Sequence, residues 1–176
     1  MITPAKRWID RTFALGLAPA AAREVFVRLR RSADRLDDAF CELPAPIRVH
    51  RPDGRWSIQE HAGHLLDLED LWARRLDDLE AGHAVLRPAD LQNRRTHEAR
   101  HNARDLPDLL AAFRSARTEI VDRLQRWSPG ELARVSRHPR LDQAMSAVDL
   151  CFFVAEHDDH HLASVSEILK ALAPRE

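Results

Sequence analysis

Residues 150–162 read LCFFVAEHDDHHL, an apolar run interrupted by acidic residues and three histidines. On a helical wheel, with about 100° per residue, His161 falls in the middle of the apolar face of this segment. His157 lies about 40° to one side, and His160 lies about 100° away at the edge of the face. Two histidines four residues apart are therefore expected to project from one helix face into the interior.

Three further segments show the same periodicity, with apolar residues three and four positions apart. Capping pairs indicate where two of the helices begin: Ser57 with Glu60, and Ser146 with Asp149. Four long amphipathic helices favour an all-α four-helix bundle, which we expect to be a single domain over residues 1–176. The expected helices run from Pro19 to about Leu43, from Ser57 to Ala81, from Asp105 to about Leu124, and from Ser146 to about Ala173.

The connections between these helices differ in composition. Pro44 and Pro46 end the first helix, and we expect residues 47–55 to be extended. Residues 83–104 are polar and predict a long, partly helical connection between the second and third helices. Residues 137–145 are predicted to form turns.

Composition narrows the class of protein. The chain has 176 residues, 44% hydrophobic and 31% charged, and its formal net charge is −1. This balance gives no support for nucleic-acid binding. No apolar run approaches the roughly 20 residues that span a bilayer, so we expect no membrane association. Residues 1–11 lack the apolar core of a signal peptide, and Cys41 and Cys151 are far apart, so we expect a cytoplasmic protein with reduced thiols.

The two histidines on the last helix can reach one metal ion from successive turns. The alternative is a pair of core histidines that hydrogen-bond to polar neighbours. A metal site needs a third ligand, and the second helix offers His61 and His64. The helical wheel slightly favours His61, which lies within about 40° of the centre of the apolar face, whereas His64 lies about 100° away.

A rival histidine pattern lies in the polar connection. His97-Glu98-Ala99-Arg100-His101 has the H-E-x-x-H form of zinc proteases, whose two histidines lie on one face of a partly buried helix. The surrounding residues lack an apolar stripe, and Arg100 would place a cation between the two ligands. We interpret this match as coincidental and keep zinc protease activity as an alternative.

Two motifs resemble those of a known family. Residues 56–65, WSIQEHAGHL, have the form W-[ST]-x-x-E-x-x-x-H-[LI], and residues 157–162, HDDHHL, have the form H-D-x-H-H-L. In spacing and order they resemble the DinB-like, YfiT-like family of metal-binding four-helix bundles. The resemblance implies an up-down-down-up bundle, a homodimer, and a divalent metal ion, zinc or nickel, held by His64, His157 and His161.

The resemblance also implies a range of chemistry. Some members of the family are transferases or isomerases that use bacillithiol, mycothiol or glutathione, and others look like metal-dependent hydrolases. Three protein ligands would leave a position open for water or for a low-molecular-weight thiol, which coordination deprotonates. Ser164 and Val165 depart from the Gln or Arg that many relatives carry after H-H-L-A, so the pocket beside the metal is not defined by the resemblance.

Asp158 is the candidate catalytic residue. It lies about 60° from His161 on the wheel and could orient a ligand imidazole or accept a proton. The alternative is a buried acid paired with an arginine. Together these features predict a metal-dependent enzyme, a thiol-dependent transferase or a hydrolase, acting on a small-molecule substrate or thiol. The alternative from another class is a non-catalytic metal-binding or sensing bundle.

Overall fold

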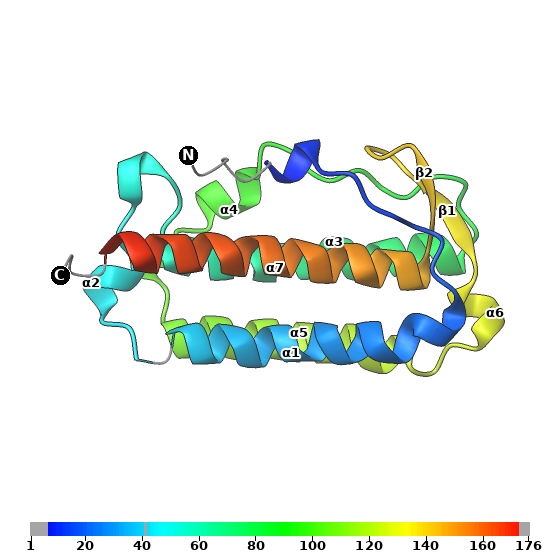
Figure 1. The fold of residues 1–176 in the computed structure, drawn as a ribbon, viewed down its shortest axis with the longest axis horizontal. Helices are drawn as coiled ribbons and strands as arrows, with labels where there is room; N and C mark the ends of the chain where they lie inside the picture. The colour runs from blue at the N-terminus through cyan, green and yellow to red at the C-terminus, as the bar shows by residue number, and fades with distance from the viewer. Residues whose placement is uncertain (1–6, 41, 173–176) are drawn as a thin grey trace.

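In the computed structural model, which describes residues 7–40 and 42–172, four long helices run along the length of the molecule (Figure 1). α1 and α7 run in one direction, and α3 and α5 run in the opposite direction. This is the up-down-down-up arrangement, so the prediction of an all-α four-helix bundle is confirmed. The four helices are α1 (Ala22–Phe40), α3 (Ile58–Glu80), α5 (Leu106–Leu124) and α7 (Ala147–Leu172).

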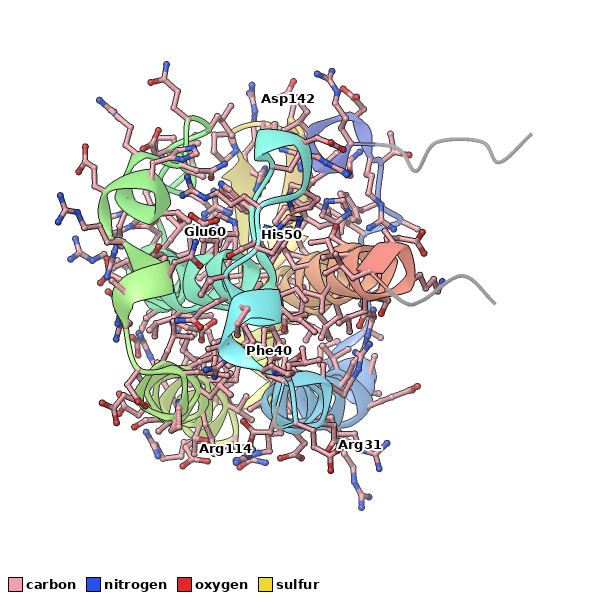
Figure 2. All side chains as sticks on the ribbon, turned by 90° about the vertical axis from the view of Figure 1, so that its left-hand side faces the viewer. Arg31, Phe40, His50, Glu60, Arg114 and Asp142 are labelled. Atoms are coloured by element: carbon pink, nitrogen blue, oxygen red, sulfur yellow. The ribbon has the colours of Figure 1, made fainter. Side chains whose placement is uncertain are left out.

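Each long helix packs against two others around a shared interior. α1 contacts α5 and α7, and α3 contacts the same two helices, so the end-on view shows the four helices at the corners of a square (Figure 2). Buried apolar side chains fill the interior in two clusters. A buried ion-pair network of Arg117 on α5 with Glu69 on α3 and Asp158 on α7 lies at the level between them. In the described ranges, no helix is long and apolar enough to cross a membrane.

Side chains cap the helices at the predicted positions. The Ser57 hydroxyl accepts from the backbone N–H of Glu60, and the Glu60 carboxylate accepts from that of Ser57. The same reciprocal bonds join Ser146 and Asp149 at the start of α7, and Asp105 caps α5. These contacts satisfy N–H groups that have no partner inside the helix, which is why the sequence patterns placed the helix starts well.

The connection between α3 and α5 must return along the bundle because these neighbouring helices are parallel. It contains α4 (Arg94–Glu98) and the 3₁₀ turn η4 (His101–Ala103), so the prediction of a long, partly helical connection is confirmed. In Figure 1 it runs along the side of α3 that faces away from α5. Gly82 follows α3 with a φ of 71°, the left-handed conformation that glycine adopts readily after a helix.

The prediction of an extended segment at residues 47–55 is wrong. The chain forms α2 (Ala45–Arg48) and the 3₁₀ turn η3 (Pro52–Gly54) instead. Proline ends a preceding helix but also fixes φ near the helical value, which suits the first turn of the next one. α1 accordingly ends at Phe40, and Pro44 and Pro46 lie at the N-cap and in the first turn of α2.

The turns predicted at residues 137–145 belong to a small β-hairpin. β1 (Val135–His138) pairs antiparallel with β2 (Gln143–Ser146) beside the start of α7, with α6 (Pro129–Leu132) just before it. Asp142, with a φ of 57°, lies in the tight connection. Strands of four residues offer too few alternating positions for the period-two pattern to be recognised in the sequence.

The segment before α1 lies along α7. The Asp149 carboxylate accepts hydrogen bonds from the backbone N–H groups of Gly16 at 2.8 Å and Leu17 at 2.9 Å. Further along, Trp8, in the 3₁₀ turn η1 (Trp8–Asp10), packs on Phe153 with ring centroids 5.0 Å apart. The segment, which continues through the 3₁₀ turn η2 (Pro19–Ala21), therefore carries Trp8 to the middle of α7. Cys41 and the expected helix end at Ala173 lie outside the described residues.

Candidate metal centre

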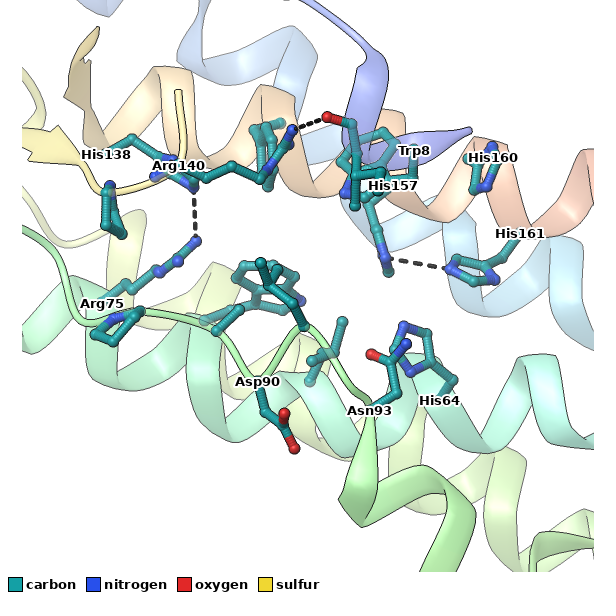
Figure 3. Close-up of a pocket in the computed structure, with 18 of the residues that line it drawn as sticks. Trp8, His64, Arg75, Asp90, Asn93, His138, Arg140, His157, His160 and His161 are labelled. Carbon is teal, nitrogen blue, oxygen red and sulfur yellow. Dashed lines mark hydrogen bonds between the residues drawn. The ribbon is translucent and has the colours of Figure 1, made fainter. Parts of the chain in front are cut away.

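Three histidines from two helices meet in the interior. His64 comes from α3, and His157 and His161 come from successive turns of α7 (Figure 3). One ring nitrogen of each lies within 4.8 Å of the others. The Nε2 atoms of His157 and His161 are 3.2 Å apart. Within residues 7–40 and 42–172, these are the histidine, cysteine or acidic side chains grouped closely enough to hold a metal ion.

A chain of hydrogen bonds fixes the His64 ring. Its Nδ1 lies 3.0 Å from the Thr96 hydroxyl, and that hydroxyl donates to Asp67 Oδ2 at 2.9 Å. Because the hydroxyl proton goes to the carboxylate, its oxygen accepts from the His64 Nδ1–H. His64 Nε2 is therefore the unprotonated nitrogen. Such an outer partner, which sets the tautomer of a histidine, is typical of metal ligands.

His101 also bonds to Asp67, the last member of this chain of hydrogen bonds. Its Nε2 lies 2.8 Å from Asp67 Oδ2, and its ring packs directly over α3 at Gly63. A Cβ at Gly63 would come within 2.1 Å of the ring, so the glycine permits the approach. Although burial raises the pKa of Asp67, the bonds from His101 and Thr96 hold it below its usual value. Asp67 is thus a carboxylate that two donors position.

His61 lies behind His161 and is not part of the three-histidine cluster. The Nδ1 atoms of the two rings are 2.8 Å apart. If His161 Nε2 is the ligand atom, its Nδ1–H donates to His61 Nδ1, as an outer hydrogen-bond partner would. The structure therefore brings His64 into the cluster and places the histidine that the helical wheel favoured in a supporting position.

The environment keeps the three rings neutral. Burial lowers the pKa of His64 to about 4 and those of His157 and His161 well below 6.5. Trp8 packs edge-on against His157 at 4.9 Å, and Trp56 stacks on His161 at 6.0 Å between ring centroids. His157 Nδ1 is buried and has no hydrogen-bond partner among the described residues. At pH 7, unprotonated nitrogens are available at the centre of the cluster.

These residues fit a divalent metal ion. Two nitrogens bound at about 2.0–2.1 Å in tetrahedral coordination lie about 3.3 Å apart, close to the 3.2 Å between His157 and His161. Neutral imidazole suits zinc, nickel, copper and iron, and no carboxylate joins the cluster in the described part of the chain. Three protein ligands would leave at least one coordination position open, and the pocket lies beside the cluster.

A pocket of about 420 Å³ adjoins the cluster. This is the size of many small-molecule sites. Aromatic rings form much of its wall, and the exposed Ile9 and Leu91 at its edge show that it reaches the surface. At the opposite end from the histidines lie three nitrogen-rich side chains: Arg75, His138 and Arg140 (Figure 3).

Several pocket residues were not predicted from the sequence. Trp8 comes from the segment before α1, and His138 and Arg140 come from the hairpin, where no helical periodicity marks a buried face. Arg75 lies on α3 among charged residues that look like a solvated surface, yet it is only 1% exposed. His138 stands directly before Pro139, and no neighbouring pattern in the sequence marks it as a pocket residue.

The candidate catalytic residue Asp158 faces away from the cluster. Its carboxylate is bonded to Arg117 at 2.5 Å and 3.2 Å, and Arg117 also pairs with Glu69. All three side chains are buried. Of the two roles considered for Asp158, the contacts are those of an acid paired with an arginine. Cys151 is also buried in the core, where burial raises the pKa of its thiol to about 12, so it is not a nucleophile of the pocket.

The H-E-x-x-H segment does not form a protease site. α4 ends at Glu98, and Arg100 has a φ of 50°, so the two histidines do not lie on one helix face. His97 and Glu98 are exposed, whereas His101 is buried against Asp67. The left-handed residue between them breaks the i,i+4 geometry that the motif requires. The same segment instead supplies Thr96 to His64.

Comparisons with known proteins agree with this fold. The family model described as the DinB superfamily matches residues 28–165. Among solved structures, the chain is similar to YfiT from Bacillus subtilis, with a TM-score of 0.78 and 17% sequence identity over 93% of this chain and 94% of that one. YfiT is described as a probable metal-dependent hydrolase with an unusual four-helix bundle topology. At this identity the likeness concerns the fold. None of the curated proteins matches the chain.

Proposed function

Because this chain belongs to the DinB superfamily, we propose that it is a metal-dependent enzyme that holds one divalent ion, zinc or nickel, through His64, His157 and His161. The observation that carries the proposal is the convergence of three neutral imidazoles at the inner end of an open pocket. A purely structural site would instead be closed by a fourth protein ligand. The pocket thus favours catalysis over a non-catalytic binding or sensing bundle.

Hydrolysis of a small-molecule substrate is the reaction we favour. When bound at such a site, a divalent ion lowers the pKa of a coordinated water towards 7 and polarises a substrate carbonyl. The residues around the site fix the orientation of the ligand rings. Thr96 and Asp67 hold the His64 ring, and His61 lies within hydrogen-bond distance of the His161 ring. Preorganised ligands of this kind avoid reorganisation during the reaction. The description of YfiT as a probable hydrolase supports the same class.

Transfer of a low-molecular-weight thiol is the second candidate. Three neutral histidines would leave the full double charge of the ion uncompensated, which favours an anionic further ligand such as a thiolate. The thiol would come from solution, since Cys151 is buried away from the cluster. We also propose that the protein is a homodimer, from the family resemblance alone. From the separated cysteines and the four amphipathic helices, we propose that it is cytoplasmic and that residues 1–176 form one domain.

The proposal is tested by metal content. The protein is purified without a His-tag and without chelators, and bound metals are measured by mass spectrometry. We expect about one zinc or nickel per chain, as a single three-histidine site implies, and loss of that metal in His157→Ala. His97→Ala is the matched control, because His97 is exposed and lies outside the cluster. It should keep the metal.

Two results would count against the proposal. One is a wild-type protein that takes up no metal even after zinc or nickel is added. The other is a His157→Ala variant that retains as much metal as the His97→Ala control. The metal-loaded protein is then assayed for hydrolysis of chromogenic esters and for consumption of glutathione with chlorodinitrobenzene. Turnover of esters without a thiol favours the hydrolase, and turnover that requires the thiol favours the transferase.

A further inference from the structure

The end of the pocket away from the metal-site histidines is formed by Arg75, His138 and Arg140, and no carboxylate among the described residues pairs with these side chains. Arg75 is 1% exposed, yet it forms no ion pair with a carboxylate in the described part of the chain; its Nε donates to the Arg87 carbonyl at 3.1 Å. The nearby Asp78 carboxylate is engaged by the guanidinium and the backbone N–H of Arg87. A buried guanidinium without a carboxylate is costly unless another anion compensates it.

His138 adds to the excess of hydrogen-bond donors at this end of the pocket. Its Nδ1 faces the backbone N–H groups of Arg140 at 3.3 Å and Leu141 at 3.2 Å, whereas its Nε2 faces the Arg75 Nη1 at 3.1 Å. A neutral imidazole has one N–H and one unprotonated nitrogen. Donors approach both nitrogens, so in either tautomer one donor faces another. An acceptor placed between Arg75 and the His138 Nε2–H would satisfy both.

Arg140 supplies a third unmatched donor. Its Nη1 donates to the Ile9 carbonyl at 2.8 Å, but its Nη2 is buried with no hydrogen-bond partner among residues 7–40 and 42–172. Burial, together with the charges of Arg75 and Arg140, lowers the pKa of His138 to about 3. All three side chains line the same pocket. Among the described residues no oxygen atom accepts from Arg75 Nη1, His138 Nε2 or Arg140 Nη2, and the Asp90 carboxylate on the pocket wall accepts from Arg94 and Gln92 instead. Three N–H donors placed in this way match the lone pairs of an oxyanion.

We propose that Arg75, His138 and Arg140 bind a terminal oxyanion of the substrate, a carboxylate or a phosphate. The two ends of the pocket are built from different turns of α3: His64 and Arg75 are eleven residues apart, a rise of about 16.5 Å along the helix at about 1.5 Å per residue. Trp8, Trp72 and Phe153 line the same pocket, and Figure 3 shows Trp8 between its two ends. The substrate is an elongated anion with an apolar middle. On the proposed function, its opposite end meets the three histidines.

The test measures binding to metal-free protein, so it does not depend on the metal centre. Isothermal titration of the chelator-treated protein compares phenylbutanoate, phenylpropyl phosphate and the neutral phenylbutanamide. Because hydrogen bonds to charged groups are the strong ones, we expect at least one anion to bind about tenfold or more tightly than the amide. The two anions distinguish a carboxylate site from a phosphate site.

Variants locate the binding. Arg140→Gln should abolish the preference for the anion. Arg137→Gln is the matched control, because Arg137 lies in the same hairpin but is exposed and paired with Asp142. It should keep the preference. Circular dichroism and the unfolding temperature confirm that both variants are folded; if Arg140→Gln is unfolded, Arg140→Lys, which should retain part of the preference, takes its place.

Three results would overturn the inference: equal affinity for the anions and the amide in the wild-type protein, no detectable binding of either anion at millimolar concentration, or an anion preference that survives in Arg140→Gln. Each is independent of the metal measurement. A protein that binds zinc but shows no anion preference would retain the proposed function and lose this inference. A protein that prefers the anion but binds no metal would lose the proposed function and retain this inference.

Discussion

Replacing Thr96 by valine isolates the contribution of the hydrogen bonds that hold His64. The two side chains have nearly the same shape, so the change removes the hydroxyl without opening a large cavity in this site, which is 4% exposed. It deletes the acceptor 3.0 Å from His64 Nδ1 and the donor 2.9 Å from Asp67. The His64 ring then loses the contact that fixes its tautomer.

The size of the effect follows from these contacts. Loss of an outer partner of a ligand histidine typically weakens metal affinity by about 10- to 100-fold, or about 1.4–2.7 kcal/mol. A buried Nδ1–H left without a partner costs about 1–3 kcal/mol, which is the same range. We therefore expect Thr96→Val to raise the zinc dissociation constant about 10- to 100-fold while three imidazoles remain.

The assay is competition for zinc against a chromophoric chelator at pH 7. Thr118→Val on α5, outside the pocket and the cluster, is the matched control and should bind zinc as the wild-type protein does. Circular dichroism checks that both variants are folded. A folded Thr96→Val protein whose zinc affinity equals that of the Thr118→Val control would refute the role assigned to the hydroxyl.

Three further changes test other parts of the account. Gly63→Ala should lower the unfolding temperature by an amount equivalent to about 1–3 kcal/mol, because the added Cβ would lie 2.1 Å from the His101 ring. Gly130→Ala is the control and should not lower it, because the Cβ added there would lie 3.9 Å from the nearest atom. Equal unfolding temperatures of the two variants would contradict the packing of His101 on Gly63. In metal-free protein, burial lowers the pKa of His64 from 6.5 to about 4, so between these pH values the unfolded state binds more protons than the folded state. The contribution of His64 to the free energy of unfolding is therefore full above pH 6.5 and decreases as the pH falls to 4. An unfolding temperature that stays constant over this range in the presence of chelator would disprove this. Asp158→Asn should lower the free energy of unfolding by about 2–4 kcal/mol in denaturant titrations, because it weakens a buried ion pair with Arg117. The zinc affinity should stay within about twofold of the wild-type value. A large loss of zinc affinity in the folded variant would restore a role for Asp158 at the metal.

The sequence predicted the helices well because their starts and faces depend on local interactions. Reciprocal bonds such as those of Ser57 with Glu60 act over three residues, and the apolar stripe of α7 acts over one or two turns. The proline-rich segment after α1 was mispredicted because proline both ends and begins helices, and its neighbours decide which. The β-hairpin was missed because its strands are only four residues long.

The candidate site was predictable only where its residues share a helix. The spacing of His157 and His161 places both on one face, but no wheel shows which nitrogen of His61 or His64 faces another helix. The Thr96 bond that selects His64 joins segments 32 residues apart in the chain. Arg75 and Arg140, which lie at one end of the pocket, are 65 residues apart (140 − 75). Such contacts depend on the packing of the whole bundle rather than on a local pattern.

The most direct test of the central claim is the position of the metal itself. Crystals of the zinc-loaded protein would be measured with X-rays on either side of the zinc absorption edge, so that the anomalous difference locates the ion. We predict one peak per chain, about 2.0–2.1 Å from a ring nitrogen of each of His64, His157 and His161. A peak beside His97 or His101 instead, or no peak within reach of the three histidines, would contradict the account.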